Sequence, residues 1–246
     1  SLDPQQYGNG LIALGKVVMN GATKAPTFVR LDQEPLVGAT SVHLESAVTG
    51  WRVGDEFVIP DTRALVGQGN EVWGNYQPQL EKRVIQSIST DGRTITFVQP
   101  LNFNHKGARD GNGHIDCYPH VANLNRNVVV RSESATGVRA HLLFTMRADV
   151  DLRNTEFKDL GRTTMGELDN TTFNPDGTVA HIGTNQIGRY PMHFHHLWGP
   201  VNPSNTGYQY RIMGSAITGG SKWGVTVHDS HFGLVQDNVV YDTGGF

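Results

Sequence analysis

The sequence predicts an all-β protein in which a parallel β-helix follows a separate β-rich domain. Three observations lead to this fold class. Helical periodicity is almost absent from the 246 residues. Short runs rich in β-branched residues, each ended by Gly, Asn or Asp, recur along the chain, as is typical of strands. In the second half, similar segments return at fixed offsets, and a period near 22 residues favours a solenoid.

Residues 1–105 are predicted to form the β-rich domain, with antiparallel strand pairs. The Asp91–Gly92 pair lies between two strand-like runs and is a strong hairpin signal. The expected strands are residues 15–19, 27–31, 41–44, 56–59, 83–88 and 94–98.

Residues 106–246 are predicted to form the coils of the β-helix. Residues 150–161 resemble residues 233–244 at a constant offset, which places Leu152 over Val235, Phe157 over Val240, Asp159 over Asp242 and Gly161 over Gly244. The spacings from Val128 to Val150 and from Ile212 to Leu234 suggest a period near 22 residues. One coil cannot bury its own apolar face, so stacked coils would form one continuous core. The alternative is an ordinary β-sandwich with chance self-similarity.

Two polar stretches interrupt this repeat, at residues 162–188 and 198–207. Long loops inside a domain are usually functional, so we expect both to leave the coils and wall a groove on the outer face. We also expect the chain to be part of a longer protein. It begins without an initiator Met or signal peptide, and it stops inside the repeating pattern.

Composition excludes several classes of function. There are 20 Lys and Arg against 23 Asp and Glu, without a basic block, which argues against a nucleic-acid partner. The sequence contains no apolar run of about 18 residues, so we expect no transmembrane segment within it. A single cysteine excludes an internal disulfide framework and any zinc site built from cysteines.

The densest chemical feature is a histidine-rich segment, residues 188–198. Strand alternation would turn Met192 and Phe194 inward, leaving His193 and His195 on the outer face, roughly 7 Å apart. By the same alternation His228 points outward from residues 225–228. If these segments stack, the three histidines share one outer wall.

We therefore predict that His193, His195, Arg189 and His228 carry the chemistry. Imidazole can move a proton at a sugar, and a guanidinium can hold a substrate carboxylate through two hydrogen bonds. Substrate binding is assigned to a wider set: Tyr190, Trp198, Trp223, Arg162 and Asp229. The sequence assigns no cofactor. Imidazoles two residues apart on a strand can bind a divalent metal, and whether these histidines do so is left open. The alternative is that His193 and His195 are structural residues, hydrogen-bonded beneath the long loop.

Four stretches resemble a known family. Residues 51–60, which begin Trp-Arg-Val-Gly-Asp, are similar to a strand of the extracellular domain named for its eight glycines. Residues 91–105 are similar to the closing hairpin of that domain, and residues 139–144 and 188–195 to the β-helix that follows it. The chain thus resembles the cell-migration-inducing hyaluronan-binding proteins, the cell-surface hyaluronidases and the fibrocystin-like proteins, and among these it looks most like bacterial secreted relatives.

This resemblance implies an extracellular, right-handed parallel β-helix facing carbohydrate, preceded by part of an eight-glycine domain. The expected function is to cleave or bind an acidic glycan, such as a hyaluronan-like uronate polymer, on the outer face of the β-helix. Cleavage would make the chain a polysaccharide hydrolase or lyase. Two rival hypotheses stay open. One is a non-catalytic module that binds glycans or proteins at the cell surface, and the other is a metal-stabilised scaffold.

Overall fold

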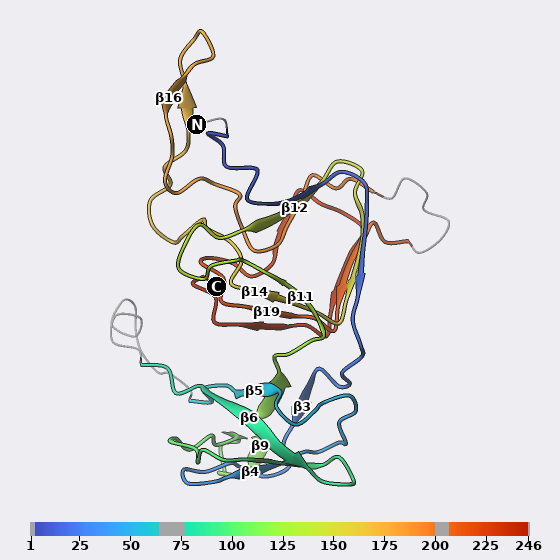
Figure 1. Cartoon of the computed structure of the whole chain (residues 1–246). Coiled ribbons are helices and arrows are strands. Elements are labelled where there is room, and N and C mark those ends of the chain that lie inside the picture. The colour runs from blue at the N-terminus through green and yellow to red at the C-terminus, as the bar shows by residue number, and fades with distance from the viewer. Residues whose placement is uncertain (1–2, 64–76, 200–206, 246) are drawn as a thin grey trace. The chain divides into compact units, whose positions relative to one another are not determined.

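The computed structural model describes residues 3–63, 77–199 and 207–245. These residues form strands, turns and bends without a helix, which confirms the predicted all-β class. The chain divides into two compact units (Figure 1). One comprises Ser1–Ala22 with Arg126–Phe246, and the other is Thr23–Asn125.

The first unit is a parallel β-helix with three four-stranded sheets. The first sheet contains β1 (Gly10–Ala13), β12 (His141–Thr145), β17 (His193–His195) and β20 (Thr226–His228). The second contains β2 (Lys16–Asn20), β13 (Asp149–Arg153), β18 (Tyr210–Met213) and β21 (Gly233–Gln236). The third contains β11 (Val128–Arg131), β14 (Thr155–Lys158), β19 (Ala216–Thr218) and β22 (Val239–Tyr241). Every neighbouring pair within these sheets is parallel, and Figure 1 shows β11, β14 and β19 side by side.

Each coil contributes one strand to each sheet, in the order first, second, third. Alternate side chains point inward and form one core, in which Phe144, Phe157 and Phe194 are fully buried. Removing a Phe side chain from water contributes roughly 1.5–3 kcal/mol. The alternation therefore turns the remaining side chains of each strand away from the core, toward the outer wall of the coil.

Residues with a left-handed backbone lie at the corners between sheets. Asn154 follows β13 and Asp159 follows β14, with φ of 50° and 53°. Two coils later Asp237 and Asp242 occupy the equivalent corners, both with φ of 54°. Asn, Asp and Gly tolerate this conformation better than other residues. This requirement explains the regular Asn, Asp and Gly positions in the second half of the sequence.

The second unit is built on a six-stranded antiparallel sheet. Its order is β3 (Phe28–Arg30), β10 (His120–Asn123), β5 (Glu56–Ile59), β6 (Glu81–Ile88), β7 (Thr94–Phe97) and β4 (Ser41–His43). A short pair, β8 (Ala108–Arg109) and β9 (Ile115–Cys117), belongs to the same unit. β6 and β7 form the hairpin predicted from Asp91–Gly92, and Gly92 has a φ of 71°.

The predicted domain boundary near residue 105 is wrong, because the chain passes from one unit to the other after Ala22 and again after Asn125. β1 and β2 pair in parallel with β12 and β13, so the β-helix begins before the antiparallel unit rather than after it. The predicted strand at residues 15–19 therefore lies in the β-helix, where Val17 and Met19 pack against its core. Residues 23–125 are an insertion within the first coil, between its second and third strands. Residues 106–125 belong to this insertion and not to the coils.

The offset between residues 150–161 and 233–244 is real and spans two coils, since Leu152 pairs with Ile212, which pairs with Val235. The period of 22 residues is wrong in detail. Ile212 lies opposite Val235 and not Leu234. Val128 and Val150 are on different sheets, the third and the second. The number of residues in a coil varies with the length of its loops. The strands and corners therefore recur from coil to coil, but not at one fixed spacing in the sequence.

Candidate functional site

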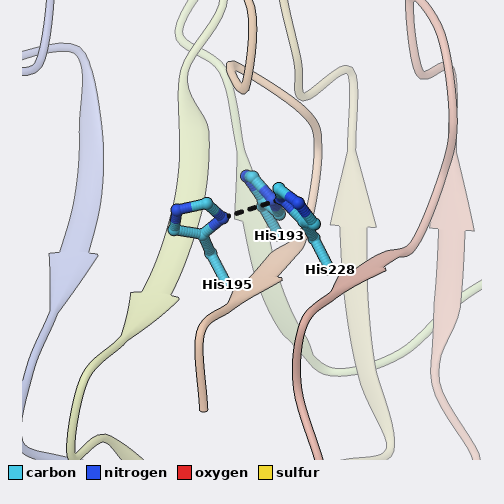
Figure 2. A group of neighbouring side chains, drawn as sticks. All are labelled: His193, His195 and His228. Carbon is cyan, nitrogen blue, oxygen red and sulfur yellow. Dashed lines mark hydrogen bonds between the residues drawn. The ribbon is translucent and has the colours of Figure 1, made fainter.

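Three imidazole rings meet on the outer face of the first sheet. β17 and β20 are neighbouring parallel strands, and their register places His195 directly opposite His228. The ring centroid of His193 lies 4.8 Å from that of His195 and 6.0 Å from that of His228 (Figure 2). We call these three residues the histidine cluster. The sequence predicts this gathering, and the structure places the rings accordingly.

The apolar neighbours of the histidines fix their direction. Met192 and Phe194 are fully buried in the core, and the Phe194 ring stacks on Phe144 with centroids 5.2 Å apart. Val225 packs against the same core. Val227 lies in register with Phe194 but is 47% exposed, because β20 is the edge strand of its sheet among the described residues. Alternation thus turns the imidazoles away from the core.

His193 is the buried member of the cluster, with 5% of its surface exposed. Its Nδ1 lies 3.3 Å from the carbonyl oxygen of Gly188. A carbonyl only accepts, so Nδ1 donates and Nε2 carries the free lone pair. Nε2 is buried and has no hydrogen-bond partner among the described residues. Burial lowers the pKa of His193 to about 4, so the ring is neutral at neutral pH.

His195 and His228 share a close contact, with their Nδ1 atoms 3.0 Å apart. One ring donates a proton and the other accepts it. Burial lowers the pKa of His195, and the neighbouring His196 and His228 lower it further. Asp229 lies beside the cluster, as predicted, with Oδ2 3.5 Å from His228 Nε2 and 3.4 Å from His196 Nε2.

A pocket of about 530 Å³ opens beside the cluster. The Tyr190 ring lies 5.0 Å from His193 and 5.1 Å from Trp223, measured between centroids, so aromatic surface continues from the imidazoles along the pocket. The lining residues are Tyr7, Leu143, Ile187, Gly188, Arg189, Tyr190, His193, His195, Trp223, Thr226, Val227 and His228. Flat aromatic faces with few polar groups are typical of a ligand site.

Arg189 is at the pocket, but its hydrogen bonds go to the protein itself. The guanidinium donates to the backbone oxygens of Gln5 and Ile187 and to the side-chain oxygen of Gln186. It also lies over the Tyr7 ring, 4.5 Å from the centroid. The predicted clamp on a substrate carboxylate would have to break this arrangement. Arg189 therefore supplies positive charge to the pocket more readily than free N–H donors.

Arg162 lies close enough to Arg189 to feel its charge. It donates to the backbone oxygens of Gln6, Asn9 and Arg139. Burial lowers the pKa of Arg162 to about 10, and the charge of Arg189 adds to this effect. Among the described residues neither arginine forms an ion pair. The structure therefore places two positive charges close together, with the carboxylate of Asp3 near enough to act on both, although Arg162 does not line the pocket.

The two predicted loops contribute unequally. Residues 162–188 contain a short antiparallel pair, β15 (Thr172–Phe173) and β16 (Val179–His181), and the end of this loop, Ile187 and Gly188, lines the pocket. Of the loop predicted at residues 198–207, positions 200–206 lie outside the described residues. Trp198 is 64% exposed and stacks on His196 at 6.0 Å, but it does not line the pocket.

Sequence reasoning missed Tyr7 and His196. Tyr7 reaches the pocket from a segment about 180 residues away in the chain, and no local pattern marks it. His196 follows β17 with a φ of 55°, at the corner that Met146 and Asp229 occupy in the neighbouring coils with φ of 59° and 44°. Aligning these corners would have paired His196 with Asp229.

Comparison with known proteins adds to this geometry. Residues 177–246, which include β17 and β20, match the family model described as CEMIP beta-helix. Human fibrocystin-L is 26% identical over 97% of this chain, and the human cell surface hyaluronidase CEMIP2 is 26% identical over 85% of it. The chain is related to the CEMIP and fibrocystin-like family, as its sequence predicts. It spans only 6% of the length of fibrocystin-L and 14% of that of CEMIP2.

Two further proteins are similar to the chain. A G8 domain-containing protein of Dictyostelium discoideum is 24% identical over 98% of the chain, which spans 18% of that protein. Among solved structures, the tailspike of Acinetobacter baumannii bacteriophage AP22, in complex with capsular saccharide, covers 96% of the chain and is itself covered to 39%. Its identity is 12% and its TM-score 0.30. No helix within the described residues has the length and apolar character needed to cross a membrane.

Proposed function

We propose that this chain binds an acidic extracellular polysaccharide in the pocket of the first sheet and that the histidine cluster takes part in cleaving it. The observation that carries the proposal is the meeting of three imidazoles with the aromatic rings of Tyr190 and Trp223 in one pocket. Aromatic rings offer apolar faces to sugar rings, and imidazole can accept or donate a proton near neutral pH.

The charge around the pocket favours a negatively charged ligand. Arg162 and Arg189 form no ion pair among the described residues, and the nearby charge of Asp3 offsets only part of their two positive charges. The pocket lining contains no Asp or Glu. A uronate polymer would therefore meet positive potential on approach. The named relatives agree with this class of ligand, because they include the human cell surface hyaluronidase CEMIP2.

The lining also bears on the reaction. Glycoside hydrolysis commonly uses two carboxylates on either side of the bond, and the described lining supplies neither. Asp229 is the carboxylate in contact with the cluster, through His228 and His196. This favours a proton transfer by imidazole, in which His195 or His228 takes or gives the proton through the Nδ1 atoms that now face each other.

The test is chain shortening by the full chain on hyaluronan and other uronate polymers, followed by size-exclusion chromatography. We expect the double variant His193→Ala/His195→Ala to lose cleavage while keeping the circular dichroism of the native protein. His114→Ala is the matched control, because its side chain is 80% exposed and lies in the other unit. Products with an unsaturated uronate absorb in the ultraviolet and indicate elimination, whereas new reducing ends without that absorbance indicate hydrolysis. Unchanged cleavage by the double variant would remove the cluster from the chemistry.

A second function is favoured by the absence of Asp and Glu from the described lining, namely a glycan-binding module without catalysis. Binding of a uronate polymer by the wild-type chain, with no shortening after prolonged incubation, would support this alternative. Weaker binding by Trp223→Ala would then place the ligand in the same pocket.

A further inference from the structure

The three nitrogen atoms of the histidine cluster point to a metal site. One ligand atom from each of His193, His195 and His228 can be chosen so that all three lie within 4.8 Å of one another. We propose that these residues bind one divalent transition-metal ion, and that Zn²⁺ fits the ligand set best. The proposal does not rest on the proposed function, but the two share atoms: an ion bound to the Nδ1 atoms of His195 and His228 would prevent these atoms from accepting a proton.

His193 has the arrangement expected of a metal ligand. Metal-binding histidines usually donate their second ring N–H to a carbonyl or carboxylate, which fixes the tautomer and aims the other nitrogen. His193 Nδ1 donates to Gly188, and Nε2 remains buried without a partner among the described residues. A buried nitrogen acceptor without a hydrogen bond is costly, and a metal ion would satisfy it.

His228 has a similar outer partner. Its Nε2 lies 3.5 Å from the carboxylate of Asp229, while Nδ1 faces His195. Asp229 can therefore accept the Nε2 proton and leave the Nδ1 lone pair for the ion. Thus the backbone carbonyl of Gly188 accepts from His193, and the carboxylate of Asp229 can accept from His228.

The spacing suits a tetrahedral ion. With metal–nitrogen distances of about 2.0–2.1 Å, two ligand nitrogens at a tetrahedral angle are roughly 3.3 Å apart. The Nδ1 atoms of His195 and His228 are 3.0 Å apart, so they are already close to this spacing. His195 is half-buried and His228 is exposed on the neighbouring strand, so part of each ring is free of packing and has room to turn toward an ion.

The ligand chemistry selects the class of ion. Three imidazoles suit zinc, copper or nickel, whereas calcium and magnesium prefer oxygen ligands. Three protein ligands leave the fourth tetrahedral position for water or for an oxygen of a ligand in the pocket. His196, His228 and Asp229 form a second candidate set, but it shares His228 and contains no buried nitrogen without a partner.

The binding test uses the full chain without a polyhistidine tag, after dialysis against a chelator, titrated with ZnCl₂ by calorimetry. We expect one ion per chain and a melting temperature that rises with zinc. His193→Ala and His228→Ala should each weaken zinc binding by at least about 100-fold, since each removes a ligand rather than an outer partner. Titration with Co²⁺ should give the intense visible absorption of tetrahedral cobalt in the wild type and lose it in both variants.

Two controls keep the result interpretable. His181→Ala removes an exposed histidine that also contacts a carboxylate, Asp169, and should bind zinc like the wild type. His196→Ala separates the two candidate sets and should also keep the cobalt spectrum. A folded His193→Ala variant that binds zinc as tightly as the wild type, or a wild type that binds no zinc, would overturn the proposal. Glycan cleavage measured with and without bound zinc tests the proposed function separately.

Discussion

His141 makes the stability of the β-helix sensitive to acid. Its side chain is fully buried at the start of β12, and Nδ1 donates to the carbonyl of Asn9 at 2.8 Å. Burial lowers the pKa of His141 to about 4, and the charge of Arg162 adds to the effect. In the unfolded chain the ring titrates near 6.5. The unfolded state therefore binds more protons in the window between these values, so stability falls as the pH falls from 6.5 toward 4.

The size of this effect follows from the two pKa values. At pH 7.5 the ring is neutral in both states and the proton linkage is close to zero. At pH 4.5 the unfolded ring is almost fully protonated and the folded ring is mostly neutral, which lowers the free energy of unfolding by about 2.5 kcal/mol. The variant His141→Asn removes this contribution while its amide N–H can still donate toward Asn9.

The assay is urea unfolding of the chelator-treated chain at pH 7.5 and pH 4.5. Wild type should lose about 2.5 kcal/mol more stability over this interval than His141→Asn, whatever the difference between them at pH 7.5. His114→Asn, an exposed histidine in the other unit, should lose as much as the wild type. Equal acid losses in wild type and His141→Asn, or an NMR titration of the folded His141 ring near pH 6.5, would refute the reasoning.

Three further predictions concern the core, the corners and the pocket. Phe194→Ala should lower the free energy of unfolding by about 3–5 kcal/mol, whereas Val129→Ala, at a residue that is 47% exposed, should change it by about 0.5 kcal/mol or less, as measured by chemical denaturation. At the corner after β13, Asn154→Val should cost about 1–2 kcal/mol because φ is 50°, while Asn154→Gly should be near neutral; equal melting temperatures would contradict this. If the pocket binds sugar rings, Trp223→Ala should weaken polysaccharide binding about two- to tenfold by calorimetry. Trp198→Ala, outside the lining, should leave that binding unchanged, and the reverse order would move the ligand elsewhere.

Local sequence determined the strands and the direction of their side chains. Alternation between apolar and polar residues places Phe194 inward and His193 and His195 outward, because only one face of the strand can join the core. The Asn and Asp residues at the corners could also be read from the sequence, since few other residues tolerate a left-handed backbone. These signals depend on neighbouring residues, and they predicted the histidine cluster.

Only the tertiary structure decided which segments complete the site and how its groups are engaged. The pairing of β2 with β13 shows that residues 23–125 interrupt a coil. The sequence did not reveal this insertion, because parallel pairing joins strands that are far apart in the chain and leaves no local pattern. The approach of Tyr7 to the pocket has the same origin. A sequence also does not show which acceptors an arginine side chain will donate its hydrogen bonds to. The guanidinium of Arg189 donates to backbone oxygens that folding brings close to it. Its positive charge could be predicted from the sequence, but these internal hydrogen bonds could not.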